Sequence, residues 1–404
     1  MVRATLFQWL GFVAVCVTGC STPETPAQAQ TREFKFIEAN CYGGVSQACA
    51  QLGLRFEAGQ GTGADIAKAV LFYQEGCRGG DQMACGRWGR ALRLGLGVQR
   101  DEERAVDLLS VACRAGDLPS CVQWGAMHEL GQGVPCNVGL ALRLYKAACD
   151  ERDPAGCSHL GSLFADGHEV LQDMPKAAEL FGMACNAGYP PACAHLGNLF
   201  ESGRGAPRDM ARAIALYTRS CDLGAGSGCL LLGLVFHKGL GTQIDDSKAR
   251  EMFVRSCDVG HSVGCAYAVR LLEGTPTLPE DPPRAAVYRV RGCLYGHGGL
   301  CADLAERCHA KGAACEPGKG WQWLIRACAN AHSTACVQAG QILESGGQFA
   351  GFVVAADRER ARGLYIRACR LGDTVGCQLD RTVPLSNAPA PPCADATPAT
   401  APEP

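Results

Sequence analysis

The sequence predicts an all-α fold, a right-handed α-solenoid superhelix of about nine 36-residue helix-turn-helix repeats reinforced by disulfides. Three observations predict it: a fixed spacing of cysteines, a helical spacing of apolar residues, and glycines where helices should end. The chain has 404 residues, of which 47% are hydrophobic and 19% charged. That is enough apolar surface for an extended core, although the length alone would also allow two or three ordinary domains.

Cysteine sets the period of the sequence. Of the 26 cysteines, twenty form ten pairs whose members lie eight positions apart. The pairs are Cys41 and Cys49, Cys77 and Cys85, Cys113 and Cys121, Cys149 and Cys157, Cys185 and Cys193, Cys221 and Cys229, Cys257 and Cys265, Cys293 and Cys301, Cys328 and Cys336, and Cys369 and Cys377. Successive pairs recur every 36 residues, except that the last two follow after 35 and 41. A fixed period of this length is typical of a solenoid, in which each unit buries its apolar face against the next.

Disulfide bonds explain these pairs better than a metal does. Zinc ligands lie two to four residues apart within a pair, whereas seven residues separate the members here. Each disulfide would close a short loop, and the loop-entropy model gives about 2.5 kcal/mol per bond as an upper guide. Because a reducing cytosol would keep so many cysteines as thiols, we expect the chain to be exported.

Each repeat should contain two antiparallel helices. Counted from the second cysteine of a pair as position 1, the segment Cys193–Gly203 has apolar or small residues at positions 1, 4, 5 and 8, which is helical spacing. Glycine at position 5 leaves room for a neighbouring helix, and glycine at position 11 can adopt the left-handed conformation that ends a helix. A second helix follows in Met210–Cys221, with Leu216 and Tyr217 on its apolar stripe.

The N-terminus reads as an export signal. Leu6–Val17 is apolar except for Gln8 and is too short to span a membrane as a helix. Val17-Thr18-Gly19-Cys20 resembles the lipobox of bacterial lipoproteins, which implies lipidation of Cys20, cleavage after residue 19, and a membrane anchor. Residues 1–19 would then be the signal peptide and 20–32 a flexible tether, and Ser21 resembles the sorting pattern for the outer membrane. A generic signal peptide, or an uncleaved anchor, remains the alternative.

The repeat itself resembles a known family. Its pattern is Cys-x-x-Leu-Gly-x-x-Phe-x-x-Gly, followed by Lys68-Ala69-x-x-x-Tyr73 and its equivalents, and then the paired cysteines. This resembles the Sel-1-like repeats, relatives of tetratricopeptide repeats, and within them the cysteine-rich branch typified by the Helicobacter cysteine-rich proteins. The resemblance covers about residues 33–377. We assign 33–380 to the solenoid and the Pro/Ala-rich segment 381–404 to a disordered tail.

Two repeats depart from the pattern. The seventh has four prolines between its helices and Val269 in place of the position-5 glycine, and the ninth has a longer loop through Gly346, Gly347 and Gly351. We expect the superhelix to bend or loosen there.

Besides Cys16 and Cys20 near the N-terminus, four cysteines lie outside the regular pairs. Cys308 and Cys315 could form a local bridge, whereas Cys136 and Cys393 could be free, pair with each other, or pair with another chain. The spacing does not decide between these states.

The exposed face of the first helix of each repeat is the candidate binding surface. In related superhelices this helix lines the concave wall, where polar residues that vary between repeats determine the partner. The candidate partner-binding residues are Arg55, Arg87, Gln123, His159 and His195. His159 and His195 occupy position 3 in adjacent repeats and could bind zinc or a peptide, but with no third ligand at a suitable spacing the simpler interpretation is solvated histidines. We therefore expect no metal and no cofactor.

The sequence contains little that suggests catalysis or nucleic-acid binding. Thirty-eight basic residues nearly balance 40 acidic ones, so no excess of cations is available for phosphates. Gly260-His261-Ser262-Val263-Gly264 matches the G-x-S-x-G pattern but falls within a cysteine-pair loop, and no Ser-x-x-Lys occurs.

These observations predict a non-enzymatic scaffold of the cell envelope. We expect an exported, lipid-anchored outer-membrane protein, facing the periplasm or the cell surface, that binds a protein or peptide on its concave face. Two alternatives remain. The cysteine-rich branch is linked to penicillin binding and β-lactamase-type activity, which the resemblance would imply here, and a purely structural surface spacer needs no ligand.

Overall fold

The structure, a computed structural model, describes residues 26–61, 63–167, 170–311 and 315–380. Its helices are α1 (Pro26–Tyr42), α2 (Ser46–Ala58), α3 (Ile66–Arg78), α4 (Gln82–Leu94), α5 (Glu102–Arg114), α6 (Leu118–Leu130), α7 (Val138–Asp150), α8 (Pro154–Asp166), α9 (Met174–Asn186), α10 (Pro190–Ser202), α11 (Met210–Asp222), α12 (Gly226–Lys238), α13 (Asp246–Asp258), α14 (Ser262–Leu272), α15 (Pro282–Leu294), α16 (Gly298–Lys311), α17 (Lys319–Ala329), α18 (Ser333–Ser345), α19 (Arg358–Arg370) and α20 (Thr374–Leu379). Two strands, β1 (Gly347–Phe349) and β2 (Phe352–Val354), lie between α18 and α19.

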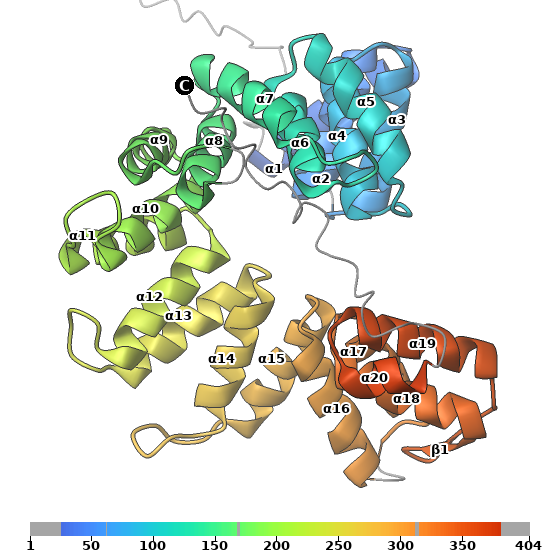
Figure 1. Cartoon of the computed structure of the whole chain (residues 1–404). Coiled ribbons are helices and arrows are strands. Elements are labelled where there is room, and N and C mark those ends of the chain that lie inside the picture. Colours follow the sequence, from blue (N-terminus) through green and yellow to red (C-terminus); the bar gives the residue numbers. More distant parts are fainter. Residues whose placement is uncertain (1–25, 62, 168–169, 312–314, 381–404) are drawn as a thin grey trace, which may run out of the picture. The chain divides into compact units, whose positions relative to one another are not determined.

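Consecutive helices pack as antiparallel pairs along the chain (Figure 1). The chain divides into two compact parts, Met1–Ala112 and Cys113–Pro404, each built from the same kind of repeat. Even-numbered helices are the first helices of the repeats, and odd-numbered helices are the second. The predicted signal peptide, Cys20 and the tail 381–404 lie outside the described residues. Helix α1 begins at Pro26, within the segment 20–32 that we predicted to be a flexible tether.

Most helices begin and end at residues whose local chemistry favours a helix terminus. In α11 the side chain of Asp209 accepts a hydrogen bond from the backbone N–H of Arg212 at 3.0 Å, which satisfies one of the free donors of the first turn. Gly203, at position 11, ends α10 with a φ of 73°, a conformation that only glycine adopts without strain. The predicted helix ends are therefore correct in the regular repeats.

Histidine replaces aspartate as the cap in three successive even helices. His261 Nδ1 accepts from the N–H of Gly264 at 3.3 Å, and His297 Nδ1 accepts from the N–H of Leu300 at 3.2 Å. His332 makes the equivalent bond to Ala335 at 3.3 Å. Only neutral imidazole can accept these bonds, so the three caps depend on the protonation state of histidine.

A disulfide links successive repeats at the joint, the turn between the second helix of one repeat and the first helix of the next. All ten predicted pairs are bonded, with Cα–Cα distances of 4.5 to 4.7 Å. Each bond connects the end of one odd helix to the start of the next even helix. The predicted class, a disulfide-reinforced helical solenoid, is confirmed.

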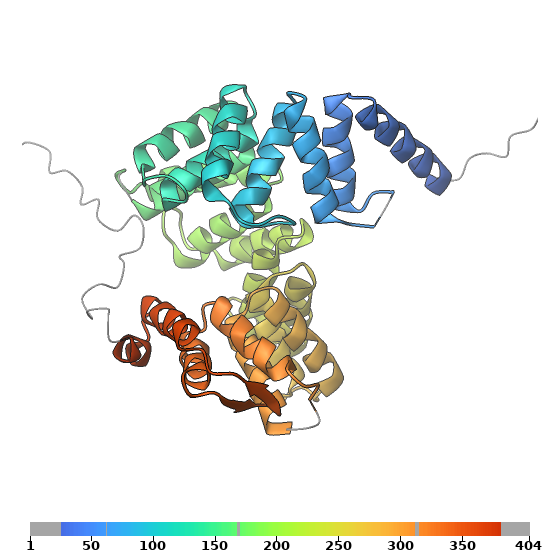
Figure 2. The ribbon, with the colours of Figure 1, turned by 90° about the vertical axis from the view of Figure 1, so that its right-hand side faces the viewer.

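The ninth repeat adds an element that we did not predict. Its long loop forms a β-hairpin in which Phe349 pairs with Phe352, seen as the pair of dark red arrows in Figure 2. The two turn residues, Ala350 and Gly351, both have positive φ (49° and 76°), which matches the twist of a two-residue hairpin turn. The fold is thus helical with one small sheet.

The off-pattern cysteines are bonded where the structure describes them. Cys308 and Cys315 form a disulfide with a Cα–Cα distance of 5.3 Å, and Cys136 is also disulfide-bonded. Cys393 lies outside the described residues.

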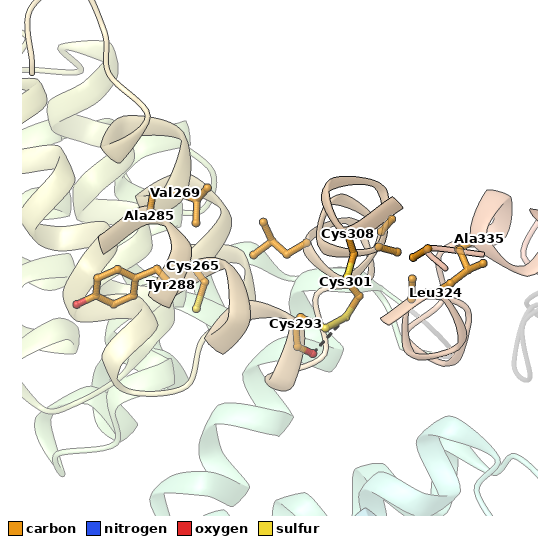
Figure 3. Close-up of a cluster of buried hydrophobic side chains, with 14 of the residues drawn as sticks. Cys265, Val269, Ala285, Tyr288, Cys293, Cys301, Cys308, Leu324 and Ala335 are labelled. Carbon is orange, nitrogen blue, oxygen red and sulfur yellow. Dashed lines mark hydrogen bonds between the residues drawn. A yellow bond between two sulfur atoms is a disulfide. The ribbon is translucent and has the colours of Figure 1, made fainter. Parts of the chain in front are cut away.

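A core cluster of buried side chains extends across the joint of Cys293 and Cys301, from α13 to β1. Figure 3 shows part of it, with Val269 near one end.

Candidate functional site

One packing unit recurs between successive helices, and we call it the slot. At the centre of a slot lies the side chain of the residue four positions before the cysteine of an odd-numbered helix. This side chain packs against the position-5 glycine of the preceding even-numbered helix. A Cβ added to Gly197 would lie only 2.5 Å from Cε1 of Tyr217. The same contact joins Gly53 with Tyr73, Gly125 with Tyr145, Gly161 with Phe181, Gly233 with Phe253, and Gly340 with Tyr365. The glycine is needed because an aromatic ring occupies the space that its side chain would fill.

Position 9 of the even helix supplies a carboxylate wherever the ring has a hydroxyl. Tyr217 Oη donates to Glu201 Oε2 at 2.6 Å. Equivalent bonds join Tyr73 to Glu57 at 2.5 Å, Tyr145 to Glu129 at 2.6 Å, and Tyr365 to Glu344 at 2.9 Å. Burial and the neighbouring carboxylate raise the pKa of Tyr365 to about 12, so the phenol remains a donor at neutral pH. Where the ring is Phe181 or Phe253, position 9 is Ala165 or His237 instead.

Position 3 of the next even helix covers the other face of the slot. His159 stacks on Tyr145 with ring centroids 4.9 Å apart, and His195 stacks on Phe181 at 5.1 Å. Partial desolvation lowers the pKa of His195 from its ordinary value. The two histidines among the candidate binding residues therefore each stack on a ring within their own slot.

The other three predicted binding residues have mixed roles. Arg87 Nη1 lies 3.5 Å from Oε2 of Glu57, the carboxylate of the slot that contains Tyr73. Arg55 forms an ion pair with Glu33. Gln123 is half-buried on α6. Their role in binding remains a prediction.

The slot of the seventh repeat is built from charges. Arg289 takes the place of the aromatic ring, Val269 that of the glycine, and Asp303 occupies position 3. Arg289, which is 5% exposed, pairs with both Glu273 and Asp303. Arg307 binds the same two carboxylates, each at 2.8 Å. Two guanidinium groups and two carboxylates thus form one network.

Such a network is a weak means of stabilising a repeat. Desolvating charges costs several kcal/mol per ion, and well-packed apolar groups of similar size are often as stabilising. The six aromatic slots show that the fold can fill this position with a ring. The charged slot therefore calls for an explanation beyond stability.

A cavity of about 740 Å³ lies beside the charged slot. Arg289 and Arg307 form part of its wall, with Val290, Leu304 and Trp323 as apolar lining. Its charged lining also includes Glu280, Glu316 and Lys319, and the disulfide of Cys308 and Cys315 lies in the wall. The sequence analysis missed this site, although arginine at the ring position was a visible signal.

The described part of the chain shows no group of three or more His, Cys, Asp and Glu side chains that could hold a metal. In the ranges that the structure covers, no helix is both long and apolar enough to cross a membrane. Ser262 begins α14, directly after the joint turn from α13, so the G-x-S-x-G pattern is not preceded by a strand.

The joints and slots define a disulfide-reinforced helical-repeat protein. The profile of the Sel1 repeat matches residues 46–81, 82–117, 118–153, 154–189, 190–224, 226–261, 300–332 and 333–373, which together make up more than half of the chain. The chain therefore belongs to the Sel1 repeat family. The matches leave out 262–299, the segment that contains Arg289.

Solved structures of other repeat proteins resemble this chain at low identity. A protective antigen of uropathogenic Escherichia coli, c5321, is 21% identical over 87% of this chain and 75% of its own, with a TM-score of 0.43. A Sel1 repeat protein from Oxalobacter formigenes is 20% identical over 57% and 92%, with a TM-score of 0.49. Cysteine-rich protein B of Helicobacter pylori is 23% identical over 33% and 96%, with a TM-score of 0.28. No curated protein sequence matches the chain significantly.

Two general properties follow from the family and the cysteines. Sel1 repeats are scaffolds typical of protein–protein interaction. Disulfides persist in oxidising compartments, so the regular set at the joints indicates an extracytoplasmic environment.

Proposed function

We propose that the protein is a lipid-anchored scaffold of the cell envelope that binds a protein or peptide along its even-numbered helices. The observation that carries this proposal is the arrangement of these helices in the part Cys113–Pro404. Helix α10 contacts α12, and α12 contacts α14, so the outward positions of these three helices form one continuous surface. We propose that this surface continues over α16 and α18. We propose that the even-numbered helices lie closer to one another than the odd-numbered helices do, which would make their outward surface the concave face of the stack.

Position 6 offers a better test of this surface than the residues predicted first. His195 packs on a ring, so its substitution would also disturb a slot. Arg270, Glu306 and Gln341 occupy position 6 in α14, α16 and α18, and all three are exposed. They differ in charge, as expected of positions that select a partner.

A pull-down from crosslinked native envelopes tests the proposal. Arg270→Glu combined with Glu306→Lys should reduce capture of the specific partner at least tenfold, because it reverses two charges on the even-helix face. Glu251→Lys, a charge reversal on the odd helix α13, is the matched control and should capture normally. Equal capture by both variants would contradict the proposal.

The anchor is tested separately. Lipidation at Cys20 requires its thiol, so Cys20→Ser should abolish incorporation of labelled fatty acid and move the protein from the membrane fraction to the soluble one. Incorporation that persists in Cys20→Ser would refute the anchor and leave the binding surface unaffected.

A further inference from the structure

Not every charged side chain that lines the cavity of the seventh repeat has a partner of opposite charge. Its two arginines share Glu273 and Asp303, and Lys319 Nζ lies 2.5 Å from Glu316 Oε2. Each lining cation is thus bound to a carboxylate. Glu280 also lines the cavity, is exposed, and forms no ion pair with any residue that the structure describes. The charge without a counterpart is therefore negative.

The remaining wall suits an aliphatic chain that ends in a cation. Val290 and Leu304 supply apolar surface, and the half-buried Trp323 supplies an indole ring. Indole rings attract ammonium and guanidinium groups, while the stems of lysine and arginine pack on apolar surface. The volume of about 740 Å³ falls within the usual range for ligand sites, so residues flanking one side chain would also fit.

An anionic ligand fits this wall less well. It would have to compete with Glu273 and Asp303 for the guanidinium groups, and with Glu316 for the ammonium group of Lys319. Its negative charge would also lie close to these carboxylates and be repelled by them.

From this balance we propose that the cavity binds a basic side chain, lysine or arginine, presented by an extended peptide segment of a partner protein. The cationic head pairs with Glu280, and the stem lies against Trp323 and Leu304. The two carboxylates of the charged slot hold Arg289 and Arg307 in place, so the wall is formed before the ligand arrives. Arg270, Glu306 and Gln341 do not line the cavity, so the two proposals are tested on different residues.

Three peptide probes test this site on the full oxidised protein. Each is a seven-residue, acetylated and amidated peptide with leucine on both sides of a central lysine, norleucine or glutamate. Binding is measured by fluorescence anisotropy. We expect the lysine probe to bind at least tenfold more tightly than the norleucine probe, with the glutamate probe weakest. Absence of a lysine preference would overturn the proposal.

Variants separate the contributions of the Glu280 charge and the Trp323 ring to binding of the lysine probe. Glu280→Gln should abolish the preference for lysine over norleucine, and Trp323→Leu, which keeps an apolar side chain, should weaken lysine binding at least threefold. Glu151→Gln, an exposed carboxylate on the joint after α7, is the matched control and should bind as the wild type does. Circular dichroism confirms that each variant is folded. A lysine preference that survives Glu280→Gln, or a glutamate probe that binds most tightly, would refute the assignment.

Discussion

The same substitution in two helices should change stability in opposite directions. Gly182 lies inside α9, and an added Cβ there would meet nothing within 4 Å. Gly182→Ala should therefore stabilise the protein by about 0.5 to 1 kcal/mol, the usual difference between glycine and alanine in a helix. Gly197, inside α10, has the same conformational cost but faces Tyr217.

The magnitude at Gly197 follows from the slot. A new Cβ would lie 2.5 Å from Cε1 and 2.8 Å from Cδ1 of Tyr217, whereas carbon atoms prefer about 3.5 to 4.0 Å. The ring must shift by about 1 Å, which strains its 2.6 Å hydrogen bond to Glu201. Overpacking costs about 1 to 3 kcal/mol, and a hydrogen bond to a charged group contributes about 1.5 to 3 kcal/mol. After the helix gain of about 0.5 to 1 kcal/mol is subtracted, we expect Gly197→Ala to destabilise by about 1.5 kcal/mol, and by up to about 5.5 kcal/mol if the hydrogen bond is lost entirely.

Local hydrogen exchange is the appropriate assay. Repeat arrays need not unfold in a single two-state step, so a global midpoint would average over many interfaces. Amides of α10 and α11 should exchange faster in Gly197→Ala, and those of α9 more slowly in Gly182→Ala. In a Tyr217→Ala background the clash is gone, so Gly197→Ala should become neutral or stabilising. If Gly197→Ala stabilises the otherwise unchanged protein as Gly182→Ala does, the slot is not close-packed and the reasoning fails.

Three further results are expected. Partial desolvation lowers the pKa of His261 and of His297; their caps are therefore fully present above the ordinary histidine pKa near 6.5 and are lost as pH falls through the lowered values. Relative to an unstructured peptide at the same pH, the amides in the first turns of α14 and α16 should be less protected from exchange at pH 5 than at pH 7.5, and aspartate at both positions should reduce that difference. Replacing Cys221 and Cys229 by serine should destabilise that joint by at most about 2.5 kcal/mol, seen as new proteolytic cleavage between α11 and α12, and an unchanged cleavage pattern would argue against a stabilising role. Tyr217→Phe should lower the unfolding free energy of its repeat by about 1.5 to 3 kcal/mol, since the ring still fills the slot while its hydrogen bond to the Glu201 carboxylate is lost. An unchanged local exchange rate would contradict this.

The regular features of this chain could be predicted because each depends on local chemistry that repeats. Two cysteines eight residues apart bridge one turn between helices wherever they occur, and a glycine at position 11 ends a helix by its own backbone freedom. The disulfides and helix ends therefore follow from short stretches of sequence. The hairpin of β1 and β2 was harder to predict, because Ala350 adopts a positive φ that its residue type does not indicate.

The roles of individual side chains were less accessible, because a slot combines three helices. His195 is exposed on its helix, as its sequence position suggests, and only the position of Phe181 shows that its imidazole also stacks on a ring. The charged slot depends in the same way on Arg289, Glu273 and Asp303, which are separated by up to thirty residues. Comparison of equivalent positions across the repeats would have shown that tyrosine and glutamate change together.

Interdependence of this kind limits how such a chain can gain or lose repeats. Deleting one 36-residue period whose two ends lie in the loops between the paired helices leaves every joint cysteine in register, yet it joins the first helix of one repeat to the second helix of the next. A phenol then lies next to an alanine, or a carboxylate next to a benzyl group. In the third to fifth repeats the ring is tyrosine, phenylalanine and tyrosine in turn. Removal of two periods at once would therefore join the carboxylate of the third repeat to the tyrosine of the fifth. Duplications and losses with their ends in these loops should therefore be tolerated more readily in steps of two repeats than in steps of one.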